Sequence, residues 1–185
     1  PMTDNDLQFG IRYDARLEIP SWNRVDFDDS LWQQVEDAAS SIEINQFVQR
    51  SYPPVYIMRR IAPQKIMVRD TRVIYDFGEN CAGRYYIKFN NTFEGQEIKI
   101  SVCERLDEYG EFVVGAYSPA YFSHDAICDG KALGCMRNFD FYTCAGSTEE
   151  EFEPRFTFTG FRYLCVEGIR DKSQVAEICM NVMHN

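Results

Sequence analysis

The 185-residue sequence has few of the groups that metal sites and hydrolytic triads need. It contains two histidines, His124 and His184, and its seven cysteines include no Cys-x-x-Cys pair. Zinc sites are built from closely spaced Cys and His ligands, so zinc binding has little support and no metal residue is assigned. Ser123-His124-Asp125 is contiguous, and neighbours on a strand point to opposite faces, so this run does not indicate a catalytic triad.

Long apolar runs and an excess of basic residues are also lacking. No apolar run approaches the ~18 residues of a membrane span, and we recognise no signal peptide at the start. The 29 acidic residues outnumber the 19 basic ones, which gives a formal net charge of -10. Nucleic acid and anionic membrane surfaces are therefore not expected as partners. Neutral or cationic partners are favoured.

The cysteine pattern favours reduced thiols. The number of cysteines is odd, and Cys103, Cys144 and Cys165 lie in segments whose sequence is typical of strands. A reduced cysteine in such a segment acts as a small hydrophobic residue. We therefore expect a reducing, cytoplasmic setting. The alternatives are a disulfide between Cys128 and Cys135 and a secreted parent protein.

The abundance of aromatic residues, 14 Phe and 11 Tyr, favours sheets. Short strands with turn residues between them predict an all-β fold, an antiparallel β-sandwich. The expected strands cover residues 55–61, 66–69, 72–77, 83–90, 96–103, 111–115, 121–127, 139–144, 152–168 and 175–183. In the longest predicted strand, residues 152–168, the alternation of apolar and polar residues changes phase near Gly160, which indicates a bulge.

The first 50 residues differ from the rest of the chain. Apolar residues are scattered there among mostly polar residues. A short helix is predicted near residues 29–38, because Leu31, Trp32 and Val35 fall on one helical face. Pro53-Pro54 then marks a boundary. We therefore expect an N-terminal adaptor segment over residues 1–50, with aromatic residues that pack on a neighbour, and the β-sandwich over residues 51–185.

The most informative run is Tyr75-Asp76-Phe77-Gly78-Glu79-Asn80-Cys81-Ala82-Gly83. Its alternation predicts a strand, a tight turn and the start of the next strand. Gly78 and Gly83 bracket a polar elbow, where the backbone needs positive φ or a close approach. Arg162 stands inside an apolar strand, so we expect it to pair with a carboxylate, Asp14 or Asp76; Arg16 is expected to pair likewise.

This run and two other segments together resemble the bacterial α-L-rhamnosidase family. The other segments are Tyr13-Asp14-Ala15-Arg16, with Trp22 and residues 27–32, and residues 153–163, which read EPRFTFTGFRY. In that family such segments occur in this order in the β-rich region that precedes a catalytic helical toroid. The resemblance implies a jelly-roll or concanavalin-like sandwich whose parent enzyme removes terminal L-rhamnose. Its implied partners are the catalytic domain and the N-terminal β-domain of the same parent chain.

The resemblance assigns no catalytic residue to this chain. The family keeps its acid and base in the toroid, on an acidic motif rich in Arg, Gly and Trp that is absent here. Glycoside cleavage needs two poised carboxylates, and no carboxylate here has a context that marks it. We therefore expect a non-catalytic segment that supports the catalytic domain and the substrate approach. The alternatives are a module that binds rhamnose-containing glycans and a self-contained hydrolase.

Four residues are candidates for contact with a carbohydrate. Tyr117 and Tyr121 lie in one loop and could stack on sugar rings. Glu79 and Asn80 lie on the elbow and offer oxygen atoms to a sugar or to Ca²⁺. The competing interpretation of the elbow is turn chemistry, in which Asp and Asn side chains bond local amides. No cofactor is expected, with Ca²⁺ as the one alternative.

Overall fold

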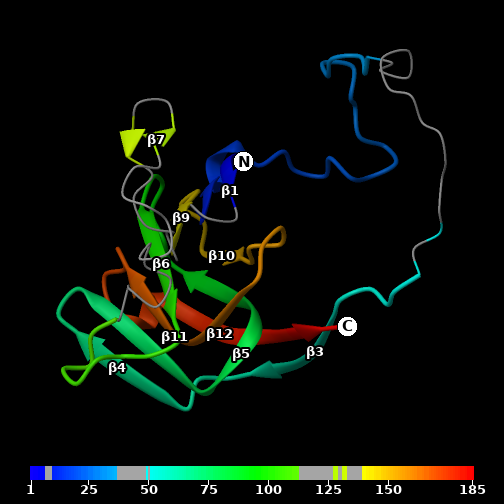
Figure 1. Cartoon of the computed structure of the whole chain (residues 1–185). Helices are drawn as coiled ribbons and strands as arrows, with labels where there is room; N and C mark the ends of the chain where they lie inside the picture. The colour runs from blue at the N-terminus through cyan, green and yellow to red at the C-terminus, as the bar shows by residue number, and fades with distance from the viewer. Residues whose placement is uncertain (7–9, 37–48, 50, 113–126, 129–130, 133–138) are drawn as a thin grey trace.

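The structure, a computed structural model, describes residues 1–6, 10–36, 49, 51–112, 127–128, 131–132 and 139–185. These residues form an all-β fold (Figure 1) with two short 3-10 helices. The strands are β1 (Met2–Asp6), β2 (Gly10–Asp14), β3 (Tyr56–Ile61), β4 (Lys65–Arg69), β5 (Arg72–Asn90), β6 (Glu97–Cys103), β7 (Ile127–Cys128), β8 (Lys131–Ala132), β9 (Phe139–Thr143), β10 (Glu149–Phe152), β11 (Thr159–Glu167) and β12 (Val175–His184). The 3-10 helices are η1 (Ala15–Leu17) and η3 (Lys172–Gln174).

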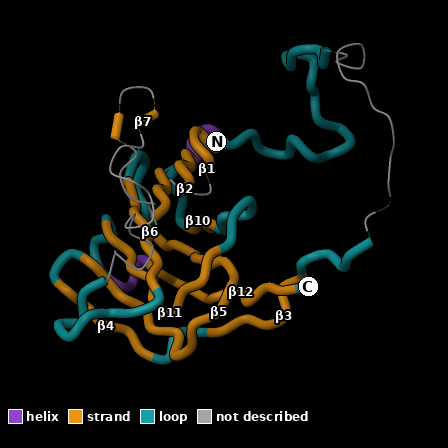
Figure 2. The backbone as a smooth tube through the Cα atoms, viewed as in Figure 1, coloured by secondary structure: helices purple, strands orange, loops and turns teal. Residues whose placement is uncertain are grey.

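The sandwich is one sheet whose two layers share β5. The first half of β5 pairs with β4 and β11, and the sheet continues through β6, β9, β2 and β1. The second half pairs with β12 and β10, and β3 follows β12 at the edge. All these pairs are antiparallel except β2 with β9, which is parallel. The predicted β-sandwich is confirmed, with this one parallel pair added. Figure 2 shows β5 between β11 and β12, in agreement with the strand order.

The core lies between the two layers. Phe89 of β5 and Tyr142 of β9 face each other across it, with ring centroids 5.6 Å apart. Ile98 and Ile100 of β6 and Leu164 of β11 are fully buried. Along β6, β9 and the second half of β5, alternate residues point inward, as the period of two requires. These residues make one continuous apolar cluster.

A bulge in β5 replaces the predicted tight turn. Phe161 of β11 pairs with Cys81, but Tyr163 pairs with Asp76, so residues 77–80 oppose a single residue, Arg162. The chain bends there without leaving the sheet, because an unequal residue count curves a strand rather than ending it. The turn expected between two strands is therefore wrong. The irregularity expected near Gly160 falls at this register shift between Phe161 and Tyr163, but the extra residues lie on β5 rather than on β11.

The two glycines that flank this bulge behave as predicted. Gly78 has φ of 83°, a conformation that favours glycine. A Cβ on Gly83 would lie 2.1 Å from the backbone oxygen of Asn181 on β12. Arg162 makes a two-pronged ion pair with Asp76, at 2.8 and 3.0 Å, and Asp76 also accepts from the Gly78 amide at 2.8 Å. The expected pairing and the turn chemistry of Asp76 are both confirmed.

The long strand predicted over residues 152–168 is wrong, because two strands occupy this region. β10 ends at Phe152 and β11 begins at Thr159. Pro154 interrupts the ladder, since proline has no amide hydrogen to donate. The three glutamates of β10 gave no strand signal in the sequence, yet Glu150 and Phe152 point inward while Glu149 and Glu151 point outward.

The N-terminal segment contributes to the sheet and then leaves it. β1 pairs with β2, and β2 pairs with β9, so the first strands belong to the same sheet as the predicted sandwich. Arg16 pairs with Asp14, as expected, at 2.7 Å. Residues 18–36 then run away from the sheet (Figure 1).

The helix predicted near residues 29–38 is not formed over residues 29–36. A single turn closes there, by a bond from the Trp32 amide to the Asp29 carbonyl, and the chain then continues without helix. Leu31 and Val35 are each 96% exposed. A short helix gains its stability from packing an apolar face, and of this face only Trp32 packs on another ring, that of Phe27. The helix in the described part of this segment is instead η1.

The thiols behave as small hydrophobes. Among the described residues, five cysteines are not part of a disulfide, and Cys103, Cys144 and Cys165 are buried as predicted. Burial raises the pKa of Cys144 and Cys165 to about 12. Cys135 lies outside the described residues, so the Cys128–Cys135 alternative stays a prediction. The predicted strands 111–115 and 121–127 also lie outside the described residues for most of their length. No helix among the described residues is long and apolar enough to cross a membrane.

Candidate functional site

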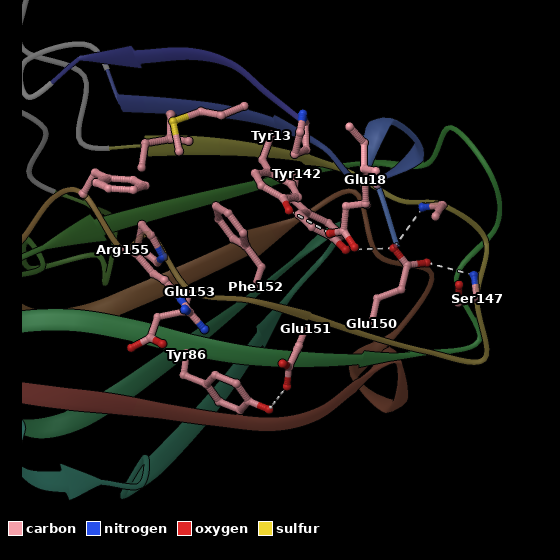
Figure 3. A pocket seen from close by; sticks show the side chains of 18 of the residues that line it. Tyr13, Glu18, Tyr86, Tyr142, Ser147, Glu150, Glu151, Phe152, Glu153 and Arg155 are labelled. Atoms are coloured by element: carbon pink, nitrogen blue, oxygen red, sulfur yellow. Dashed lines mark hydrogen bonds between the residues drawn. The ribbon is translucent and has the colours of Figure 1, made fainter. Parts of the chain in front are cut away.

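A cleft of about 860 Å³ lies between the N-terminal strands and the segment that runs from β10 toward β11 (Figure 3). Residues from β2, β5, β9 and β10 meet there because the sheet folds back on itself. The cleft is lined by Pro1, Met2, Ile11, Tyr13, Ala15, Glu18, Ile19, Trp22, Trp32, Tyr86, Tyr142, Ala145, Ser147, Glu149, Glu150, Glu151, Phe152, Glu153, Pro154, Arg155 and Phe156. Aromatic and acidic side chains dominate this lining.

The aromatic floor is rigid. The rings of Tyr13 and Tyr142 stack with centroids 5.8 Å apart and 7° between their planes. Phe152 packs against both, at 5.5 and 5.1 Å. Tyr142 and Phe152 are buried, so these rings cannot move without disturbing the core. Phe156, at the edge of the cleft, is 68% exposed.

Glu150 is the buried carboxylate beneath this floor. It accepts from the Tyr142 hydroxyl at 2.9 Å, from the amides of Ala145, Gly146 and Ser147 at 2.9 to 3.0 Å, and from the Thr92 hydroxyl. Burial by itself would raise the pKa of Glu150, but these donors outweigh it and lower the pKa. This carboxylate therefore orders the turn at residues 145–147 and stays ionised.

The other glutamates of β10 stand on the rim. The Tyr86 hydroxyl donates to Glu151 at 2.8 Å, and this bond raises the pKa of Tyr86 to about 12. Glu149 pairs with Lys88 of β5 at 3.0 Å. Across the cleft the Tyr13 hydroxyl donates to Glu18 at 2.8 Å. Each of these carboxylates keeps an edge toward solvent.

Glu153 connects the cleft to β5 and β12. It accepts from the Arg84 guanidinium and from the Asn181 amide, both at 2.7 Å. Arg84 also donates to the carbonyl of Arg155, at 3.2 Å. These bonds fix the chain that carries Arg155 and Phe156 out of β10, so both side chains are held at the mouth of the cleft.

A second buried carboxylate, Asp140 of β9, lies in the core beside the cleft. It accepts from the Ile11 amide at 2.7 Å and from the Tyr85 hydroxyl. Burial raises the pKa of Asp140, although both hydrogen bonds act against this shift. Asp140 therefore joins β2, β5 and β9 rather than facing a ligand.

The structure does not bring the predicted sugar contacts together. Glu79 lies on the β5 bulge, where Arg59 holds both its oxygens at 2.8 Å and lowers its pKa. Asn80 is exposed beside it. Tyr117 and Tyr121 lie outside the described residues. Neither Glu79 nor Asn80 lines the cleft, so their contact with sugar stays a prediction.

Sequence reasoning missed the glutamates of β10, since three consecutive Glu residues suggest a solvated loop. The run Glu149–Phe152 has no alternation of apolar and polar residues, so the local sequence offered no signal for this strand. No group of three or more His, Cys, Asp or Glu side chains suited to a metal occurs among the residues that the structure describes.

Comparison with known proteins decides the family. The family described as the bacterial alpha-L-rhamnosidase concanavalin-like domain matches residues 66–184. The chain belongs to this family. Alpha-L-rhamnosidases of Formosa agariphila and Streptomyces avermitilis are 30% and 29% identical to it, over 93% and 100% of its length. The resemblance seen in the sequence motifs is thereby confirmed.

Solved structures agree with this assignment. An alpha-L-rhamnosidase from Dictyoglumus thermophilum matches the whole chain with a TM-score of 0.80 and 31% identity. The Streptomyces avermitilis enzyme, solved in complex with L-rhamnose, matches it with a TM-score of 0.83 and 28% identity. The chain spans 16 to 17% of the length of the two curated relatives and 16 to 19% of these solved chains.

Proposed function

We propose that this concanavalin-like domain is a non-catalytic part of an α-L-rhamnosidase-like glycoside hydrolase of bacterial origin. It braces the catalytic domain and helps to shape the approach of the substrate. Its partners are the catalytic domain and the N-terminal β-domain of the parent chain. The observation that supports the proposal is that the chain matches the concanavalin-like domain of alpha-L-rhamnosidases and covers only 16 to 17% of the length of two such relatives.

The use of the buried carboxylates supports a structural role. Asp140 and Glu150 are the buried acids among the described residues, and both accept several hydrogen bonds from the protein itself. Cleavage of a glycosidic bond needs one acid to donate a proton and a second to act as base or nucleophile. Asp140 and Glu150 accept hydrogen bonds from the protein itself, so they stabilise the fold rather than act on a substrate.

Exposed apolar residues support contact with neighbouring domains. Trp22 is 60% exposed, and Val25, Leu31 and Val35 are almost fully exposed. Ile66 and Val68 of β4 also face solvent. Apolar surface of this extent on connected segments is typical of interaction sites. The buried free thiols support a reducing, cytoplasmic setting for the parent protein.

Hydrolysis of an aryl α-L-rhamnoside by the purified chain tests the proposal. We expect no release of the aryl group above the rate with buffer alone, because the buried acids among the described residues, Asp140 and Glu150, are both engaged by donors of the protein itself. The Streptomyces avermitilis alpha-L-rhamnosidase serves as the positive control. Release of the aryl group by the chain would overturn the non-catalytic role.

A further inference from the structure

We propose that the cleft beside β10 binds a neutral sugar unit of the approaching glycan and disfavours units that carry a carboxylate. The inference rests on the proposed function, in which the domain shapes the substrate approach. It adds a site and a selectivity for charge.

The size and lining of the cleft suit a small polar ligand. Its volume of about 860 Å³ falls in the range of about 300 to 1,000 Å³ that small-molecule sites occupy. The floor is made of stacked rings, and carboxylates and a guanidinium stand on the rim. Such a site offers an apolar surface with a few polar groups that fix orientation. A pyranose ring has the same two characters, an apolar C–H face and hydroxyls around its edge.

Phe156 provides an exposed aromatic face at the mouth of the cleft. The ring is 68% exposed, so it contributes little to the core. Its backbone follows Arg155, whose carbonyl accepts a bond from Arg84. The ring is therefore presented at a fixed place, where the C–H face of a sugar can stack on it.

The polar groups of the rim can satisfy sugar hydroxyls. Glu151 uses one oxygen to accept from Tyr86 and has further acceptor sites on its carboxylate. Arg155 lines the same cleft and supplies N–H donors. A hydroxyl both donates and accepts, so it can bond to both groups.

The charge of the rim sets the selectivity. Five glutamates and one arginine line the cleft. Glu150 and Glu153 are compensated by their own donors and Glu149 by Lys88, which leaves Glu18 and Glu151 as acids on the rim. A uronate in the cleft would lie within the screening length of these charges, about 8 Å at physiological ionic strength. A neutral sugar meets no such repulsion.

Calorimetric titration of the purified chain with two disaccharides tests the inference. One is a neutral rhamnosyl-glucose and the other a galacturonosyl-rhamnose. We expect the neutral disaccharide to bind with a millimolar Kd and the acidic one about tenfold more weakly at low salt. Because salt screens the rim, this gap should narrow at about 1 M salt.

Two pairs of variants assign the effect to the cleft. Phe156→Ala should weaken binding of the neutral disaccharide about tenfold. Its control is Phe158→Ala, since Phe158 is similarly exposed, at 66%, but does not line the cleft. Glu18→Gln, at a rim acid that lines the cleft, should strengthen binding of the acidic disaccharide and leave the neutral one unchanged. Its control is Glu108→Gln, on an exposed loop away from the cleft.

Three outcomes would overturn the inference: no heat from the neutral disaccharide at millimolar concentration, equal affinity for both disaccharides, or an equal effect of the two Phe variants. None of these outcomes would affect the non-catalytic role, which the rhamnoside assay tests separately. Sugar release in that assay would contradict the proposed function whatever the cleft binds.

Discussion

Single residues of this domain show how burial and hydrogen bonding shift the pKa of a carboxyl group in opposite directions. Burial raises the pKa of Asp140, while donors lower the pKa of Glu150 despite its burial. The difference follows from the number of donors. Asp140 accepts from one amide and one hydroxyl, whereas Glu150 accepts from three amides and two hydroxyls.

Replacing Asp140 by Asn should change how stability depends on pH. A carboxyl whose folded pKa is raised keeps its proton in the folded state after the unfolded chain has lost it. Its contribution therefore falls as the pH rises from the ordinary value of 3.8 to the raised pKa. The Tm difference between wild type and Asp140→Asn should decline over this window and then become constant.

Thermal melts from pH 3 to pH 8 measure this difference. Asp76→Asn is the matched control, because Arg162 lowers the pKa of Asp76. Its contribution should be present above 3.8 and lost as the pH falls through the lowered pKa. A Tm difference for Asp140→Asn that grows with pH would contradict the shift.

At the scale of the element, β5 decides the architecture. It spans 19 residues and pairs with four other strands, β4, β10, β11 and β12. The bulge at residues 77–80 turns its second half into the other layer. Gly83, just after the bulge, lets β12 approach.

Gly83→Ala should separate β5 from β12. The added Cβ would meet the backbone oxygen of Asn181, which cannot rotate away as a side chain could. We expect a loss of about 3 kcal/mol in the free energy of unfolding. Gly95→Ala is the control, since its Cβ would meet open space apart from Arg16 at 3.6 Å. There only the positive φ costs energy, about 1 kcal/mol.

Urea unfolding of both variants checks this prediction. An equal loss in the two variants would show that the approach of β12 to Gly83 is not tight.

Elements with a strong period were predictable from the sequence, and those that depend on distant partners were not. β6 alternates cleanly, and both β6 and β12 were predicted almost to their ends. β10 consists mainly of glutamates, which form a strand because Lys88 and Tyr86 of β5 stand opposite. The helix expected near residues 29–38 had the right pattern, but Leu31 and Val35 of its apolar face are exposed. Likewise, the cleft depends on the return of β10 to β5, which no local pattern reveals.

The whole molecule exposes apolar side chains in its N-terminal segment, where Leu31 and Val35 are each 96% exposed. Replacing both by Ser should leave stability unchanged within about 0.5 kcal/mol, because neither contributes to the core. The double variant should also self-associate less, since it removes apolar surface. Thermal melts and light scattering measure the two effects.

Leu164→Ser is the contrasting control, because Leu164 is fully buried. It should lower the Tm strongly. If the double variant lowered the Tm as much, residues 31 and 35 would be buried in solution.

The passage of β5 through both layers has a mechanical consequence. The layers are continuous through one covalent backbone, so they cannot hinge or slide apart without breaking hydrogen bonds on both sides of that strand. Bodies attached to opposite faces of the domain would be held at a constant spacing. The domain would then act as a stiff spacer that sets how far apart its neighbours stand.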